Sequence, residues 1–150
     1  MKKALLLSVL MILMSGNILS AYSRASGNWT GTGIGIVLGY PGNVGLSIKI
    51  KNFPVLGLSW YLGESPYFGG TLDYWIINNN IDSDFYWYIG VGAYAWIGNP
   101  FGLGPRLPIG LQWFPGSGPF ELAIELAPAL SLLPGIEPRI QGSLAFRFHF

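Results

Sequence analysis

Residues 139–150, at the end of the chain, alternate between two kinds of side chain. Successive side chains of an extended strand point to opposite sides, so this stretch predicts a β-strand with two unlike faces. One face carries Ile140, Gly142, Leu144, Phe146, Phe148 and Phe150, and the other carries Gln141, Ser143, Ala145, Arg147 and His149. The fold must therefore supply an apolar surrounding on one side of this strand and a polar one on the other.

The same alternation recurs in seven earlier stretches, which are separated by turns rich in Gly, Pro, Asn and Ser. The predicted strands are residues 29–40, 44–51, 55–62, 71–78, 85–97, 106–113, 120–128 and 139–150, with 78–84 as a polar connection. Pro108 cannot donate a ladder hydrogen bond, so we expect a bulge or a local break there. The pattern predicts an all-β chain, an eight-stranded antiparallel up-and-down β-barrel.

The scarcity of charge indicates which face of the strands meets lipid. Charged residues make up 10% of the chain, too few to coat a soluble domain, so we expect the apolar faces to point into a membrane. After the N-terminal segment, Gly or Pro interrupts nearly every apolar run before it reaches the roughly 20 residues of a spanning helix. A closed barrel is the other structure that satisfies all backbone polar groups in lipid.

Two alternatives stay open at this point. A soluble secreted lipid-binding barrel of lipocalin type would turn the apolar faces inward around a ligand, but its outer face would then be mostly Gly, Ser, Ala and Tyr. An enzyme acting on outer-membrane lipid would need polar residues clustered at an outward-facing rim. We rank both below the membrane barrel.

The N-terminal residues 1–25 predict a secretory signal peptide. Lys2 and Lys3 precede an apolar run over residues 4–14, and small residues offer cleavage after Ala21 or Ala25. A single barrel domain would occupy residues 26–150. Without Lys2, Lys3 and Arg24, five basic residues face seven acidic ones, a formal charge of −2. No basic patch predicts nucleic-acid binding, and the absence of cysteine excludes disulfides and thiolate metal sites.

The inward face of the predicted barrel carries several charges. Eight strands enclose an interior just wide enough for their own side chains, and an isolated buried charge is strongly disfavoured. We therefore predict a structural ion-pair network inside the barrel, comprising Glu121, Glu125, Arg147 and Arg106, with Lys49 as a further candidate. Glu121 and Glu125 could also be interpreted as paired catalytic carboxylates, but Arg147 on the neighbouring strand favours structural pairing.

Outward-facing aromatic residues near strand ends predict girdles at the two lipid–water boundaries. The residues concerned are Trp60, Trp87, Trp113, Phe120, Phe148 and Phe150.

The remaining motifs are weak. His149 is the only histidine, which argues against a multi-histidine metal site or a catalytic triad, and we expect a side chain at the barrel rim. The glycine-rich residues 31–35 resemble half of a dinucleotide loop but lack the helix and acidic residue that should follow. Asp82 and Asp84 lack the Gly and terminal Glu of an EF-hand and predict a solvated turn. We therefore predict no catalytic residue, metal or cofactor.

The signal peptide, the eight alternating strands and the terminal aromatic residue resemble the small OmpA-like outer-membrane β-barrels. More narrowly, RLPIGLQW (106–113), FELAIELAP (120–128) and the closing RFHF resemble a spirochaete-type family of small outer-membrane barrels of poorly defined function. The resemblance implies a barrel in outer-membrane lipid with both termini in the periplasm and a non-catalytic structural or surface-interaction role. It also implies that the barrel assembly machinery recognises Phe146, Phe148 and Phe150. Family members with roles at the host-facing surface use long outer loops, whereas the outer connections predicted here are short.

Overall fold

The computed structural model describes residues 32–51 and 54–150. The predicted signal peptide and residues 29–31 of the first predicted strand lie outside the described residues. The strands are β1 (Gly33–Gly39), β2 (Val44–Lys49), β3 (Val55–Tyr61), β4 (Tyr67–Asp82), β5 (Phe85–Ile97), β6 (Gly102–Arg106), β7 (Ile109–Trp113), β8 (Phe120–Ser131) and β9 (Glu137–His149). A 3₁₀ turn at Pro115–Ser117 lies between β7 and β8. Within the described ranges, no helix is long and apolar enough to cross a membrane.

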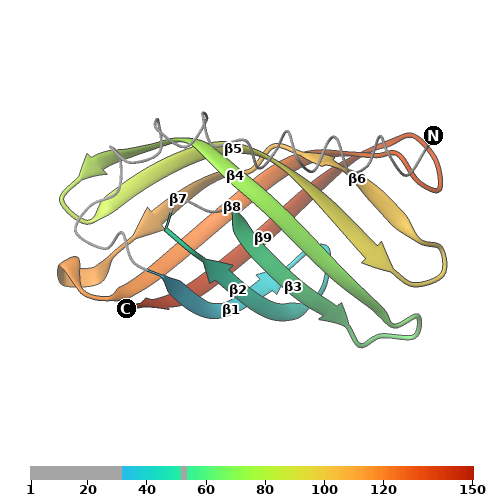
Figure 1. The fold of residues 1–150 in the computed structure, drawn as a ribbon, viewed down its shortest axis with the longest axis horizontal. Helices are drawn as coiled ribbons and strands as arrows, with labels where there is room; N and C mark the ends of the chain where they lie inside the picture. Colours follow the sequence, from blue (N-terminus) through green and yellow to red (C-terminus); the bar gives the residue numbers. More distant parts are fainter. Residues whose placement is uncertain (1–31, 52–53) are drawn as a thin grey trace.

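The strands close into a barrel in which every neighbouring pair is antiparallel (Figure 1). Pairing follows chain order from β1 to β5, and β9 closes the sheet by pairing with β1 over Gly33–Gly39. β6 and β7 both pair with β5 on one side and with β8 on the other, so they form two halves of one strand. The predicted eight-stranded up-and-down barrel is confirmed.

The break between β6 and β7 falls at Pro108, where the sequence predicts it. β6 ends at Arg106 and β7 begins at Ile109, because a proline has no N–H for the ladder. Backbone bonds still continue on both sides of the break. The Gly90 N–H donates to the Pro108 carbonyl at 2.8 Å, and the Leu107 N–H donates to the Pro128 carbonyl at 2.9 Å.

Several predicted boundaries are wrong. β4 begins at Tyr67 and not at residue 71, β8 continues to Ser131 and not to residue 128, and β9 begins at Glu137 and not at residue 139. Residues 78–82, expected in a polar connection, continue β4 and pair with β5 as far as Asp82 opposite Phe85. A register shift after Trp75 turns Asn78 inward. The hydrogen-bonded pairing of β4 with β5 therefore continues through residues that no longer alternate between apolar and polar. The sixth strand also begins earlier than residue 106, with Gly102 opposite Trp96. The sequence did not predict this start, because the glycines in residues 102–105 interrupt the alternation of apolar and polar side chains.

The two faces of the barrel differ sharply in exposure. On β9, for example, Phe148 is 45% exposed and its neighbour Arg147 is 4% exposed. Large apolar side chains point outward from every strand, whereas the inward side chains are aromatic, small or charged. The interior of the barrel is therefore where its polar chemistry is concentrated.

Candidate functional site

Glu121 of β8 is the centre of the first polar cluster inside the barrel. Its carboxylate is fully buried and accepts hydrogen bonds from Arg147 Nη1 at 2.6 Å and Gln112 Nε2 at 2.5 Å. His149 Nε2 lies 2.6 Å from its other oxygen, and Lys49 Nζ lies 4.0 Å from that same oxygen. One carboxylate therefore serves four partners, and we call these five residues the Glu121 cluster.

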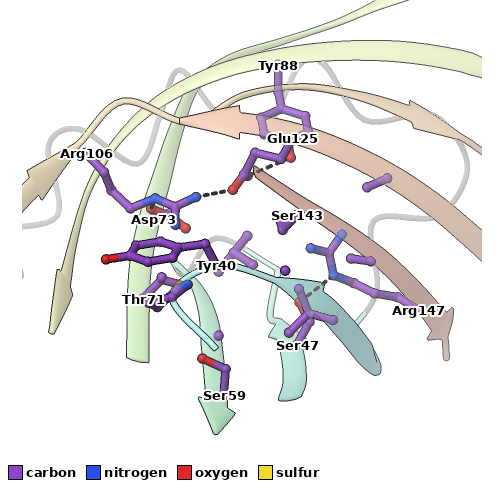
Figure 2. A pocket seen from close by; sticks show the side chains of 17 residues that line it. Tyr40, Ser47, Ser59, Thr71, Asp73, Tyr88, Arg106, Glu125, Ser143 and Arg147 are labelled. Carbon is purple, nitrogen blue, oxygen red and sulfur yellow. Dashed lines mark hydrogen bonds and ion pairs between the residues drawn. The ribbon is translucent and has the colours of Figure 1, made fainter. Parts of the chain in front are cut away.

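Arg106 of β6 is the centre of the second cluster, part of which Figure 2 shows. Its Nε lies 3.0 Å from Asp73 Oδ1, its Nη1 donates to Gln141 Oε1 at 2.8 Å, and its Nη2 pairs with Glu125 Oε1. The Tyr88 hydroxyl donates to the other Glu125 oxygen at 2.7 Å. One guanidinium therefore joins two carboxylates and an amide, and we call these five residues the Arg106 cluster.

Glycines on intervening strands let these side chains meet. Gly92 of β5 lies directly opposite both Asp73 and Arg106, and a Cβ at this position would collide with the Asp73 carboxylate. Gly110 of β7 similarly lies between Tyr88 and Glu125. Each contact thus crosses a strand at a residue that has no side chain.

A glycine also lets two side chains meet across β1, the strand that pairs with β9 to close the barrel. Gly35 of β1 lies opposite both Arg147 and Ser47, and Arg147 Nε donates to Ser47 Oγ at 2.8 Å across it. A Cβ on Gly35 would collide with the backbone at Phe146 and Arg147. The close approach of β1 to β9 therefore requires glycine at this position.

The charges inside the barrel balance. Lys49, Arg106 and Arg147 face Asp73, Glu121 and Glu125, and all six are paired. With a neutral His149, the formal charge of the two clusters is zero. The aromatic wall adds contacts, because Trp75 stacks on Tyr88 at 4.0 Å and Lys49 Nζ lies 4.6 Å from the Trp75 ring centroid. Burial of charge is tolerated only with such compensation.

The structure brings together the five residues named from the sequence, distributed over the two clusters. Sequence reasoning missed Asp73, Tyr88, Gln112, Gln141 and His149 as members. Asp73 had a usable signal, because it is a single acid at an inward position of an otherwise apolar strand. Gln112 and Gln141 had no such signal in the sequence, because only the register of neighbouring strands brings their amides within hydrogen-bonding distance of Glu121 and Arg106.

The expected rim position of His149 is wrong for its side chain. The residue lies near the end of β9, but the ring is 1% exposed. Gly33 opposite leaves room for it, and the Phe114 ring covers it with a centroid separation of 5.6 Å. The adjacent Glu121 carboxylate supplies the polar contact that makes this burial favourable.

A third group of side chains lies inside the opposite end of the barrel, beyond the β1–β2 connection. Arg139 Nη1 donates to the Tyr40 hydroxyl at 3.1 Å, and its guanidinium lies 5.1 Å from the Trp96 ring centroid. Tyr67 stacks on Tyr61 at 5.2 Å and donates to the Pro41 carbonyl. We call Tyr40, Tyr61, Tyr67, Trp96 and Arg139 the mouth cluster.

A small cavity of about 40 Å³ separates the mouth cluster from the Glu121 cluster. Figure 2 shows hydroxyl side chains around it, interspersed with the charged side chains of Asp73, Arg106, Glu125 and Arg147. The hydroxyl residues are Ser47, Ser59, Thr71 and Ser143. The wall of the cavity therefore combines hydrogen-bonding groups with apolar side chains such as Val37, Val55, Ala123 and Ala145.

The aromatic residues predicted for the girdles all lie near strand ends. Trp60 lies opposite Phe68 near the mouth end, and the other five lie near the end that contains the C-terminus. There Phe85 stacks on Trp113 at 5.9 Å, and Phe120 stacks on Phe146 at 5.8 Å and meets Phe148 edge-on at 5.4 Å. Their position relative to a membrane stays a prediction.

The other weak motifs resolve into local structure. Asp82 Oδ1 accepts a hydrogen bond from the Ser83 N–H at 2.7 Å, and Asp84 Oδ2 accepts one from the Gly116 N–H at 3.1 Å. Over the described parts of the chain, no group of three or more His, Cys, Asp or Glu side chains is placed to hold a metal ion.

Comparison with known proteins gives no match to a family model, a curated protein or a solved structure. The fold therefore defines the class of protein, an eight-stranded antiparallel β-barrel with an apolar outside and a charge-balanced inside. The resemblance to OmpA-like and spirochaete-type barrels stays a prediction.

Proposed function

We propose that this protein is an integral outer-membrane β-barrel of a diderm bacterium, with both termini in the periplasm. The observation that carries the proposal is the polarity of its two faces. Large apolar side chains are exposed all around the barrel, among them Ile36, Leu72, Val91, Leu111 and Ile124. A soluble monomer rarely exposes contiguous apolar patches larger than a few hundred Å², and this belt runs over the strands of the barrel, with the outward side chains of β3 half-buried.

Lipid is the surrounding that makes such a belt favourable. Moving one large aliphatic side chain out of water contributes about 1.5–3 kcal/mol, and the belt contains many. Backbone pairing around the closed barrel satisfies the N–H and C=O groups that lipid cannot. Outer-membrane lipid is therefore the partner that the surface fits best.

The polar interior disfavours the soluble lipid-binding alternative. A site for a lipid or similar ligand is mostly apolar and measures about 300–1,000 Å³, whereas the cavity here is about 40 Å³ and four charged side chains, Asp73, Arg106, Glu125 and Arg147, border it. A barrel of lipocalin type would need the opposite arrangement of its two faces.

A structural or surface-interaction role follows from the filled lumen and the short connections. Both polar clusters, with Trp75 and Tyr88, occupy the interior, so we propose neither a general pore nor catalysis. The connections at the mouth end are residues 40–43, 62–66, 98–101 and 132–136. Such short loops favour contacts made by the rim itself over those of a long-loop adhesin. Steady ion conduction by liposomes that contain the protein would contradict a closed lumen.

Fractionation of the producing cells tests the location. We expect the protein in the outer-membrane fraction, with a folded band that migrates differently on a gel with and without boiling. A soluble periplasmic protein without the shift would overturn the proposal.

We also propose that Phe146, Phe148 and Phe150 form the signal recognised by the barrel assembly machinery. Phe150 is 70% exposed, so Phe150→Ala should change the unfolding free energy of purified protein by less than about 1 kcal/mol. The same variant should accumulate poorly in the outer membrane of cells. Normal membrane levels of Phe150→Ala, or a large loss of stability in vitro, would contradict a role in assembly.

A further inference from the structure

The cavity beneath the mouth cluster is a chamber inside the barrel, with several polar side chains in its wall. Its volume of about 40 Å³ gives room for about three water molecules, at about 10–15 Å³ of accessible volume each. Hydroxyls from β2, β3, β4 and β9 face it. Apolar side chains such as Val55 and Ala145 complete the wall, but cavities that stay empty lack polar partners for water, and this one has several.

Ser59 supplies an independent sign of an occupant. Its side chain lines the chamber and is 5% exposed, and its Oγ has no hydrogen-bond partner among the described residues. Buried polar groups in proteins are nearly always hydrogen-bonded. Ser59 therefore needs a small molecule that can donate or accept a hydrogen bond.

The charges around the chamber restrict that molecule to a neutral one. Asp73 and Glu125 pair with Arg106, and Arg147 pairs with Glu121. The four charges that line the chamber sum to zero, and an added unpaired charge is strongly disfavoured in such a place. The walls present both donors and acceptors, which suits water and small neutral polar solutes.

Among the described residues, the route into the chamber lies at one end. Toward the C-terminus, the Glu121 cluster and Phe114 fill the interior with buried side chains. At the other end the chamber borders the half-buried Tyr40 and the adjoining Pro41. Gly69 lies between this turn and the chamber, because a Cβ there would contact Pro41 Cγ at 3.2 Å and Ser59 Oγ at 3.3 Å.

We propose that the chamber is a blind, hydrated site that admits small neutral polar molecules from the Tyr40–Pro41 end. The inference concerns the inside of the barrel, so it does not rest on the proposed membrane location. The chain contains no cysteine, which allows single introduced thiols to report on the chamber without a background reaction.

The test compares four single-cysteine variants in detergent. Ser59→Cys and Ser143→Cys report on the chamber, Ser65→Cys on the exposed surface near the mouth, and Ala127→Cys on a buried inward position that does not line the chamber. Each is treated with neutral methyl methanethiosulfonate, and modification is followed by mass. Circular dichroism verifies that each variant is folded.

We expect both chamber thiols to react more slowly than the Ser65→Cys thiol, but at least about tenfold faster than the Ala127→Cys thiol, because thiol reactivity follows access. Cationic and anionic methanethiosulfonates should react more slowly than the neutral reagent at both chamber positions. Chamber thiols as inert as that of Ala127→Cys would overturn the proposal, and equal rates with the charged reagents would overturn the restriction to neutral molecules.

A second comparison tests the route. Gly69→Val, combined with Ser59→Cys, places a branched side chain between Pro41 and the chamber and should lower the rate to the level of Ala127→Cys. Gly70→Val on the same strand is the control, because a Cβ there meets no atom closer than 3.5 Å. An unchanged rate with Gly69→Val would show access from elsewhere and contradict the proposed route. All these rates are measured without a membrane, so they stand apart from the fractionation result.

Discussion

The two polar clusters inside the barrel both stabilise a buried charged group, but the central group is an anion in one and a cation in the other. In the Glu121 cluster, one buried carboxylate is shared by two cations, an imidazole and an amide. In the Arg106 cluster, one guanidinium is shared by two carboxylates and an amide. Phe114 covers His149 of the first cluster, which borders the chamber only through Arg147, whereas Asp73, Tyr88, Arg106 and Glu125 of the second all border it (Figure 2).

The comparison of their charges shows that neither cluster is electrically neutral by itself. The Glu121 cluster carries one excess positive charge and the Arg106 cluster one excess negative charge, if His149 is neutral. Arg147 belongs to the first and also lines the chamber with Glu125 and Asp73 of the second. The interior is therefore one charge-compensated unit in which the Glu121 cluster should be the more sensitive to loss of a partner.

Glu121→Gln should have the largest effect. It removes the only carboxylate of the Glu121 cluster and leaves Lys49 and Arg147 buried without a counter-charge, a change that costs about 3–5 kcal/mol. Urea unfolding in detergent, followed by tryptophan fluorescence, measures the free energy of unfolding.

Glu137→Gln is the matched control for this change. Glu137 pairs with Arg139 at 3.2 Å, but its side chain is 65% exposed, so the loss should be no more than about 1 kcal/mol. Similar losses for the two variants would show that burial does not control the strength of these pairs.

Glu125→Leu should have an intermediate effect. Arg106 keeps Asp73 and Gln141 as partners, while the buried Tyr88 hydroxyl loses its acceptor, which costs about 1–3 kcal/mol. The heat-resistant folded band on an unboiled gel and the urea midpoint should both weaken. If both are unchanged, Glu125 is incidental to stability and the two clusters do not act as one unit.

Gly92→Ala should have an effect similar in size to that of Glu125→Leu and tests how the Arg106 cluster is assembled. The added methyl group would displace the Asp73 carboxylate, and such overpacking costs about 1–3 kcal/mol. Gly70→Ala, whose nearest atoms are 3.5 and 3.9 Å away, should be neutral or should stabilise by about 0.4–1 kcal/mol. Equal unfolding free energies for the two variants would contradict the steric role of Gly92.

Several features of the molecule could be predicted from local sequence because their causes are local. Alternation assigns Arg147 to the inside and Phe148 to the outside, since neighbouring side chains in a strand must diverge. Pro108 predicts the break before β7 because it lacks an N–H. The extension of β4 to Asp82 was missed, because pairing with β5 continues through a stretch without apolar alternation.

The sequence by itself thus determined the barrel and the inward direction of the five charged residues in the predicted network. Only the tertiary structure decided which inward side chains meet, because that depends on the register between strands that are distant in sequence. The registers that place Asp73 and Arg106 on either side of Gly92 join two charges across β5, and closure of β9 on β1 places His149 beside the empty position at Gly33. Alternation along a strand determines whether a side chain points into or out of the barrel, and the pairing of strands in the closed sheet determines its height along the barrel axis.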